Sequence, residues 1–498
     1  MKILLVRTRY TLPEFYLPRF INEPLGLEYL AAAVHDKHKV EIFDSIAEGW
    51  NKYARVHGNK DFFYQGAELN KLQRKISEFK PDVIGISWIF SVQKKPTQET
   101  INFIKKNNKD LKIIVGGSHV SVDPERILKE NPGIDIVVYG EGEITLKELL
   151  DKNLRNLQTI DGITYRLTSL LVGRGEEIIK NPPRALVKEI DFIAPPLRMA
   201  VPYQNYSKQM LYVYLVNRFK KYKFLSKDNQ RKLAYIASKT PYLEKPYYKI
   251  YNKRHKHDLH LPEGDIMTSR GCPNNCVFCA VHTLWKHTWR AHSVERVLSE
   301  IDELVVKHKL KRINIQDDNF NISKERIIKI CEGIVKNKYD ITFSASGTYA
   351  PALDENVLTW LQKAGFRNIR LSIESGNQEI LDKVIKKRID LKTIPGIVRM
   401  AKKLGIIVEG AFIFGLPGET KETMRDSVNF AKHAGFDVIK YFIYQPFPNT
   451  EAYDICKEKG YITEDYDEEN IFITGTNAYV KTEDFTPEDV LKIARDLD

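Results

Sequence analysis

The chain has 498 residues, of which 43% are apolar and 29% charged, and its formal net charge is +12. This composition excludes a disordered chain, and the length allows two to four domains with cores that need no disulfides. Three of the five cysteines fall within eight residues, a pattern that favours a metal site over a disulfide framework.

The N-terminus and the hydropathy of the chain predict where the protein works. The apolar run at residues 1–6 is too short for a signal peptide and stops at Arg7, and no stretch approaches the length of a transmembrane helix. We therefore expect a cytoplasmic protein whose thiols stay reduced. The excess of Lys and Arg, densest at residues 218–223 and 253–256, favours solvated helix faces, with binding of an anionic substrate or lipid headgroup as the alternative.

Residues 1–151 alternate short β-branched runs with amphipathic helical patterns. The candidate strands are residues 2–6, 40–44, 83–87, 112–116 and 136–139. This alternation predicts a parallel sheet with helices on both faces, a doubly wound α/β domain. Ligands bind beyond the carboxyl ends of such strands, where Gly116, Gly117, Gly140 and Gly142 would let a ligand approach the backbone closely.

Residues 152–262 are predicted to be a connector with an insertion. Residues 161–166 have the pattern of a short hairpin strand, and two Pro-Pro pairs break regular structure after it. An aromatic and basic stretch at about residues 207–239 is predicted to be partly helical. We hypothesise that the insertion near residues 203–248 helps to line the site.

From residue 263 to residue 455 the alternation returns with longer helices. The predicted strands are residues 265–268, 312–315, 342–345, 368–372, 407–414 and 438–443, and the predicted helices are residues 293–307, 324–336, 355–363, 378–385, 391–404 and 421–433. Six βα units predict a partial β/α barrel, whose active site lies at the carboxyl ends of its strands. Residues 456–498 form a short acidic extension to which the sequence assigns no role.

A cysteine cluster follows the first barrel strand directly. Cys272, Cys276 and Cys279 have the spacing Cys-x3-Cys-x2-Cys. Soft thiolates select zinc or iron–sulfur clusters. A structural zinc ion would need a fourth ligand, for which His282 and His287 are candidates, whereas a cluster with three protein ligands leaves one iron open. Cys331 and Cys456 lie in predicted helices, where we expect them to be packing residues.

This cysteine loop resembles that of the radical S-adenosylmethionine (SAM) superfamily, which has the same spacing after the first strand of a partial barrel and an aromatic residue, here Phe278, before the third cysteine. The resemblance implies a [4Fe-4S] cluster on the three cysteines, with SAM chelated at the open iron. It also implies an oxygen-sensitive enzyme that makes a 5′-deoxyadenosyl radical. Four further segments at successive strand ends resemble those that hold SAM, and they implicate Asp317, Ser346, Glu374 and Gly415 together with Phe278.

The N-terminal domain resembles the cobalamin-binding domain that precedes the barrel in many of these enzymes. The resemblance rests on the segments at residues 23–33, 115–119 and 139–143, and it implies that the four glycines named above contact cobalamin. The Asp-x-His-x-x-Gly motif that supplies a lower cobalt ligand in another group is absent. His119 comes closest to that motif, as a cobalt ligand, a loop residue near the corrin or a plain surface residue. The resemblance implies cobalamin bound base-off without a histidine ligand.

The family contains methylases of unactivated carbon and the anaerobic magnesium-protoporphyrin ester cyclase. The leading hypothesis is a cobalamin-dependent methyltransferase acting on a small-molecule or lipid-like substrate, with ferredoxin or flavodoxin as electron donor. A second hypothesis is the same radical chemistry without methyl transfer: cyclisation, oxidation or C–C coupling. A third is a zinc- or cluster-stabilised binding protein without catalysis. We expect no nucleic-acid partner, because only the net charge favours one.

Overall fold

The computed structural model describes residues 1–13, 22–56, 59–167, 177–198, 206, 209, 211–213, 215–216, 227–238, 263–467 and 477–497. The chain divides into two compact units, Met1–Val187 with Phe192–His255, and Lys188–Asp191 with Lys256–Asp498. Most of the aromatic and basic insertion lies outside the described residues, apart from helix α9 (Lys227–Ser238) and a few single positions. The first strand of the second unit, β11, begins at Glu263.

The first unit is built on a seven-stranded sheet with the order β10-β9-β8-β7-β6-β1-β3. Its strands are β1 (Lys2–Arg7), β3 (Lys39–Asp44), β6 (Val83–Ser87), β7 (Lys112–Gly116), β8 (Ile136–Val138), β9 (Ile163–Leu167) and β10 (Glu177–Lys180). The first five of these are parallel, whereas β9 and β10 add an antiparallel edge. The predicted doubly wound fold is confirmed, and the strand order reverses between β1 and β6, where such folds bind their ligands.

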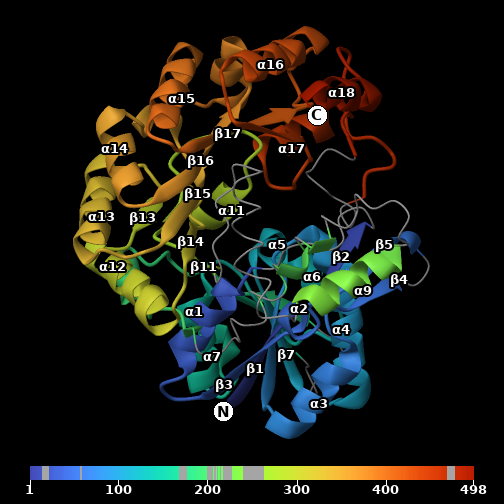
Figure 1. Cartoon of the computed structure of the whole chain (residues 1–498). Helices are drawn as coiled ribbons and strands as arrows, with labels where there is room; N and C mark the ends of the chain where they lie inside the picture. The colour runs from blue at the N-terminus through green and yellow to red at the C-terminus, as the bar shows by residue number, and fades with distance from the viewer. Residues whose placement is uncertain are drawn as a thin grey trace. The chain divides into compact units, whose positions relative to one another are not determined.

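Two apolar cores form because successive side chains of a strand point to opposite faces. Leu4 and Val6 of β1 pack on one side, and Ile3 and Leu5 pack on the other. Helices α1 (Leu25–Val34) and α7 (Gly142–Asp151) cover the second side, and α3 (Leu69–Phe79), α4 (Lys94–Asn107) and α6 (Pro124–Glu130) cover the first, as Figure 1 shows. The short helices α2 (Ser45–Glu48) and α5 (Ser118–Val122) follow β3 and β7.

A small antiparallel sheet in this unit was not predicted. It has the order β2-β5-β4, with β2 (Tyr10–Pro13), β4 (Tyr53–Val56) and β5 (Asn59–Gln65). The Arg9 guanidinium lies 4.1 Å from the centre of the Tyr64 ring, and both side chains bond to Glu99, at 3.1 and 2.6 Å. These contacts tie the small sheet to α4, a link between distant residues that sequence periodicity does not reveal.

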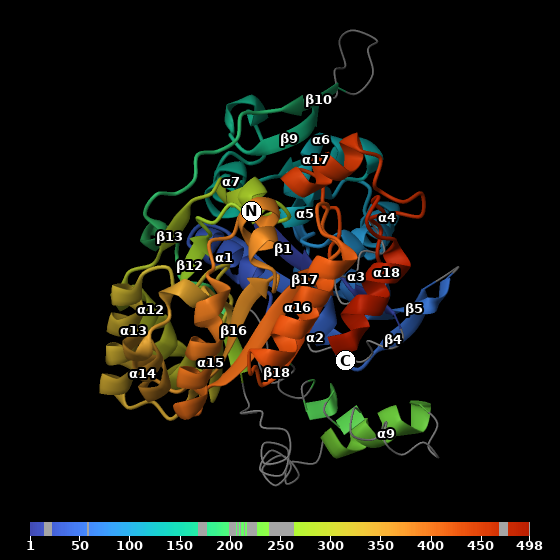
Figure 2. The same cartoon turned by 90° about the horizontal axis from the view of Figure 1, so that it is seen from above.

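The second unit is an open sheet of six parallel strands that follow one another in chain order. They are β11 (Glu263–Ile266), β14 (Arg312–Ile315), β15 (Thr342–Thr348), β16 (Phe366–Glu374), β17 (Ile407–Phe414) and β18 (Val438–Ile443). Helices α12 (Val294–Asp302), α13 (Lys324–Asn337), α14 (Glu355–Lys363), α15 (Ile394–Lys403) and α16 (Lys421–His433) form an arc on the outer side of the strands (Figures 1 and 2). The predicted partial barrel is confirmed, although the predicted helix at residues 378–385 is a π-helical segment, Ile380–Ile385.

The inner face of this barrel is polar. Ile313, Phe343 and Leu371 are buried, as are their apolar neighbours on the strands. Between them, polar side chains bond to one another across the strands: Gln316 donates to Asp265 at 2.7 Å, Arg312 to Asn368 at 3.1 Å, and Arg370 to Glu409 at 3.0 Å. A closed eight-stranded barrel fills its interior with branched apolar residues. The polar inner face of this open barrel is therefore compatible with the binding of a polar ligand inside it.

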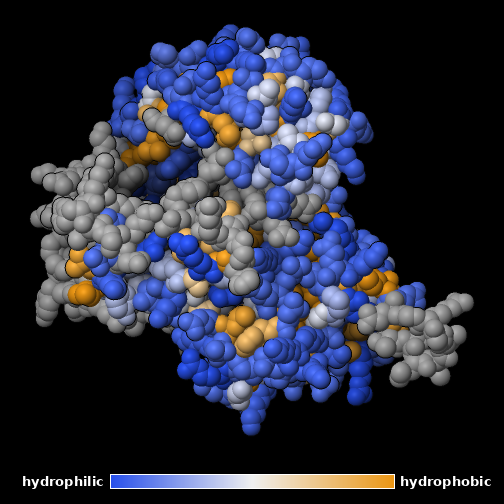
Figure 3. Space-filling view, turned by 90° about the vertical axis from the view of Figure 1, so that its right-hand side faces the viewer, coloured by the Kyte–Doolittle hydropathy of each residue, from blue (hydrophilic) through white to orange (hydrophobic). Residues whose placement is uncertain are grey.

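The surface of the described residues is mostly hydrophilic. On the face drawn in Figure 3, apolar residues appear only in small scattered groups. Of the helices that the structure describes, none combines the length and the apolar character that crossing a membrane requires.

The turn after β17 is closed by a buried carboxyl group. The backbone N–H groups of Gly415 and Leu416 donate to Glu419 Oε2 at 2.8 and 2.9 Å, and Glu419 is fully buried. On the far side, helix α18 (Pro487–Ala494) packs on the turn, because a Cβ at position 415 would lie 3.0 Å from Val490. Burial raises the pKa of Glu419 to about 7, against the opposing effect of the two N–H groups.

This raised pKa predicts a loss of stability as the pH rises. Below pH 4.5 the carboxyl is protonated in both folded and unfolded chains, and its full contribution, about 3 kcal/mol, is present. The contribution is lost as the pH rises through 7. Glu419→Gln keeps an acceptor for both N–H groups but cannot ionise. The midpoint of thermal unfolding should therefore fall less between pH 5 and pH 8 in this variant than in the parent.

Glu458→Gln is the matched control, because Glu458 is exposed on α17 (Glu451–Glu458). Its pH dependence should equal that of the parent. An unchanged slope in Glu419→Gln would show that Glu419 is ionised in the folded chain.

Candidate functional site

A two-stranded hairpin positions the cysteine loop. Strand β12 (Ser269–Gly271) ends directly before Cys272 and pairs with β13 (Trp289–Ala291), with Gly271 opposite Trp289. Gly271 has a φ of +86°, and a Cβ there would lie 2.2 Å from the carbonyl oxygen of Thr288. Only glycine tolerates both the positive φ and this short contact, and it therefore allows the hairpin to form directly before Cys272.

The three cysteine thiols of the loop lie close enough to influence one another electrostatically. Burial is the largest cause that raises the pKa of Cys276 to about 12 and that of Cys279 to about 11, and the neighbouring cysteine thiols contribute to both shifts. A thiol in such a place ionises only with a cation beside it, and a bound metal supplies that charge. Three soft sulfur donors on one short loop fit an iron–sulfur cluster.

The alternative zinc ligands pack against each other. The rings of His282 and His287 stack with their centres 3.9 Å apart, and burial lowers the pKa of His282 to about 4. Within the described ranges, no three His, Cys, Asp or Glu side chains converge on a point that would hold a single ion.

The segment that follows β14 supports the start of the cysteine loop through hydrogen bonds. Asp317 is buried and accepts hydrogen bonds from the backbone N–H and the hydroxyl of Thr268, both at 2.6 Å, and from the hydroxyl of Ser269. Burial raises the pKa of Asp317, against these bonds. The resemblance implied that Asp317 contacts SAM. In the structure both carboxylate oxygens accept hydrogen bonds from the residues that precede the loop, and the contact with SAM stays a prediction.

The residues after Asp317 extend this support. Asp318 accepts from the backbone N–H of Gly271 at 2.9 Å, and the Asn319 amide lies 3.6 Å from Cys272 Sγ as a donor. The sequence marked this segment as a strand end with polar residues but did not predict that it faces the loop. Arg326 adds a further bond, donating to the carbonyl of Thr268 at 2.7 Å.

A buried ion pair lies at the end of β16. Lys387 Nζ donates to Glu374 Oε1 and to the carbonyl of Ser372, both at 2.7 Å. Burial lowers the pKa of Lys387, but Glu374 and then Cys276 outweigh it, so that the pKa is raised. Glu374 has a φ of +73°, a strained conformation for a residue other than glycine. The unusual backbone conformation of Glu374 and its ion pair with Lys387 together position this carboxylate near Cys276.

The other predicted SAM contacts lie at the expected strand ends. Ser346 is exposed near the end of β15, Phe278 is half-buried between two of the cysteines, and Gly415 begins the turn after β17. Lys387 was missed, because in the run Lys386-Lys387-Arg388 it has the sequence pattern of a solvated residue.

The predicted cobalamin contacts lie at the carboxyl ends of β7 and β8. Gly117 has a φ of +126°, and a Cβ there would lie 2.5 Å from the carbonyl oxygen of Trp88, so this glycine serves packing. Gly140 has a φ of +78° with open space where its Cβ would be, whereas Gly116 and Gly142 have neighbours at 3.5 and 3.1 Å. Gly140 is therefore the glycine that a ligand could approach most closely.

His119 is held in place next to these glycines. Its ring stacks on Trp88 with the centres 4.9 Å apart, and Nδ1 lies 3.2 Å from Ser91 Oγ. Burial lowers its pKa to about 4, so the ring is neutral at pH 7.

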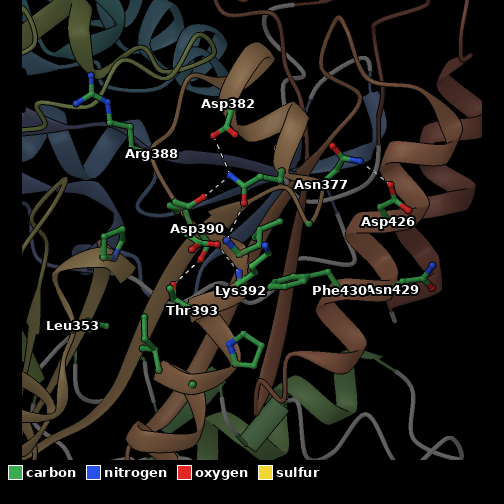
Figure 4. Close-up of a pocket in the computed structure, with 18 of the residues that line it drawn as sticks. Leu353, Asn377, Asp382, Arg388, Asp390, Lys392, Thr393, Asp426, Asn429 and Phe430 are labelled. Carbon is green, nitrogen blue, oxygen red and sulfur yellow. Dashed lines mark hydrogen bonds between the residues drawn. The ribbon is translucent and has the colours of Figure 1, made fainter.

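A large hollow of the second unit has no cysteine in its lining. It has a volume of about 1360 Å³ and is lined by residues between Pro351 and Phe430, among them Leu353 and Thr393 (Figure 4). Its acidic groups bond to neighbours: Asp426 accepts from Asn377 at 2.8 Å, and Asp382 from Gln378 at 3.1 Å. We assign it no ligand.

Comparisons with known proteins agree with this architecture. The family profile of the radical SAM superfamily matches residues 266–431, and that of the B12 binding domain matches residues 18–150. An uncharacterized methyltransferase of Pyrococcus horikoshii is 30% identical over 462 residues, which are 91% of this chain and 83% of the relative. The cytidylyl-2-hydroxyethylphosphonate methyltransferase of Streptomyces wedmorensis is 27% identical over 93% of this chain and 82% of its own.

A solved structure has the same fold. The radical SAM methyltransferase TsrM of Kitasatospora setae, with cobalamin and a [4Fe-4S] cluster bound, aligns with a TM-score of 0.65 at 18% identity, over 93% of this chain and 79% of that one. Two matched domains and a relative similar over nearly its whole length agree. The chain therefore belongs to the radical SAM superfamily, in the group whose members carry an N-terminal B12-binding domain.

Proposed function

We propose that this radical SAM enzyme holds a [4Fe-4S] cluster on Cys272, Cys276 and Cys279 and methylates an unactivated carbon of a small-molecule or lipid-like substrate with the help of cobalamin. The observation that carries the proposal is the loop that gathers the three thiols at the carboxyl edge of an open parallel barrel. The names of two relatives, both methyltransferases, support methyl transfer.

When bound, the cluster and cobalamin would supply the chemistry that side chains lack, namely one-electron cleavage of SAM and carriage of a methyl group. The chain itself would hold and orient these groups. Asp317 and Asp318 fix the loop that carries the thiols. The proposed contacts for SAM are those that the resemblance implied: Phe278, Asp317, Ser346, Glu374 and Gly415.

Glu374 would bind the amino group of SAM through its carboxylate. Lys387 holds that carboxylate in place, since its buried ammonium group donates to Oε1 at 2.7 Å.

Cobalamin would bind at the carboxyl edge of the sheet in the first unit. The strand order reverses there between β1 and β6. Phe90, which follows β6, is 51% exposed and offers an apolar surface to a corrin ring. Gly140 would let the corrin or its tail approach the backbone, with Gly116, Gly117 and Gly142 forming the neighbouring turns. We propose that residues 1–151 form this domain, residues 152–262 the connector, residues 263–455 the barrel and residues 456–498 the extension.

The competing reaction is radical chemistry without methyl transfer. Product mass separates the two, because methylation adds one CH2 unit to the substrate and cyclisation or oxidation does not.

Replacing any one of the three cluster cysteines by Ala should abolish the cluster absorbance and the formation of 5′-deoxyadenosine. The reason is that two thiolates cannot hold a cubane with one vacant iron. Iron content, the visible spectrum and 5′-deoxyadenosine are measured after anaerobic reconstitution with dithionite and SAM.

Cys331→Ala and Cys456→Ala are the controls. Both cysteines are fully buried in helices, on α13 and α17, so their loss should lower stability by about 1 kcal/mol and leave the iron content unchanged. Full iron content in Cys272→Ala, Cys276→Ala or Cys279→Ala would contradict the assignment.

His119→Phe should leave the cobalamin content and the visible spectrum of the bound cobalamin unchanged. Phe keeps an aromatic ring on Trp88 and removes both nitrogens, so it separates packing from ligation. A spectral change or loss of cobalamin in this variant, with the melting temperature unchanged, would make His119 a cobalt ligand.

A further inference from the structure

A second, smaller hollow lies directly against the cysteine loop. Its volume is about 370 Å³. One wall is formed by Pro273, Asn274 and Asn275, the residues between the first two cysteines, and the other by Asp382, Lys386, Lys387 and Arg388. The backbone N–H of Val277 donates to the carbonyl of Ile385 at 3.3 Å, which ties the two walls together.

Basic side chains predominate along the second wall. Residues 379–392 include five basic and three acidic residues. Four of the basic side chains are exposed, namely Lys383, Lys386, Arg388 and Lys392, and two of them line the small hollow. We refer to this pair, Lys386 and Arg388, as the loop-side basic patch. The fifth, Lys387, points inward to Glu374.

The acidic neighbours offset this charge only in part. Lys383 pairs with Glu379 at 2.7 Å, and Lys386 pairs with Glu451, but all four side chains are between 43% and 74% exposed, where such pairs contribute little. Asp390 is turned to its own backbone, where it accepts from the N–H of Lys392 at 3.0 Å. In Figure 4 the Arg388 guanidinium points away from the large hollow, consistent with its place in the wall of the small one.

The proposed function requires one electron for each SAM cleaved. The carrier is oxidised by one electron, the cluster is reduced by one, and the C5′–S bond of SAM then breaks to give methionine and the 5′-deoxyadenosyl radical. No described side chain stores electrons, so the electron comes from outside. Because electron transfer slows steeply with distance, the carrier must dock where the cysteine loop reaches the surface.

We propose that the loop-side basic patch, together with the half-buried Asn274 and the exposed Asn275, forms the docking surface for an acidic one-electron carrier protein. This inference rests on the proposed cluster and adds the partner of the same site. Opposite charges raise the rate of encounter and orient the carrier, and the small hollow accepts a projecting edge of it. The interaction is transient and salt-sensitive, as a carrier that must leave after each electron requires.

The test compares two reductants on one variant. Lys386→Gln/Arg388→Glu removes two positive charges and adds one negative charge, and the control Lys336→Glu reverses an exposed charge on α13. With a reduced acidic flavodoxin in low salt, the double variant should form 5′-deoxyadenosine about 10-fold more slowly than the parent and the control. With dithionite, a small reductant that needs no docking surface, all three proteins should react at the same rate.

Binding supplies a readout that does not depend on turnover. The Kd of flavodoxin for the protein without its cluster should be about 10-fold weaker for the double variant, and the parent's Kd should weaken as salt rises. Equal Kd values, equal rates with flavodoxin, or equal losses with both reductants would overturn the docking surface. Failure of the parent to cleave SAM even with dithionite would instead overturn the proposed function, while the Kd comparison would still decide the docking surface.

Discussion

The geometry of the cysteine loop depends on one buried carboxylate. Asp317 accepts three hydrogen bonds from Thr268 and Ser269, and those residues lead directly into the strand that precedes Cys272. A buried carboxylate that lost these donors would be costly, and the donors would be left unsatisfied. The end of one barrel strand thus fixes the start of the loop that follows another.

In both units the candidate binding residues lie at the carboxyl edge of a parallel sheet. In each, parallel strands bring their carboxyl ends together, so that residues far apart in the chain share one rim. The second unit adds a polar inner wall, because its six strands do not close and the interior is not packed with apolar side chains. The first unit buries both faces of its sheet, and only its rim is available to a ligand.

Periodicity and spacing predicted the strands, the order of the βα units and the three cysteines, because each is encoded within a few neighbouring residues. The loop supports were not predictable in the same way. Asp317 has the pattern of a polar strand end that contacts a ligand, and only the fold shows that it faces Thr268. Lys387 stands in a run of three basic residues, and its burial against Glu374 arises from a chain reversal that no local pattern encodes. The sheet of β2, β5 and β4 depends on pairing across more than forty residues in the same way.

The terminal helix α18 carries no sequence motif, but it covers part of an edge strand that could otherwise promote aggregation. An open barrel has two edge strands whose outer backbone groups can pair with another chain. Helix α18 contacts β18, one of these edge strands, and also α16 and the Gly415 turn. A chain truncated before Pro487 would keep every cysteine and both cofactor edges, but it would uncover apolar surface beside an unpaired strand. Poor recovery of such a truncated chain would then reflect self-association, not damaged chemistry.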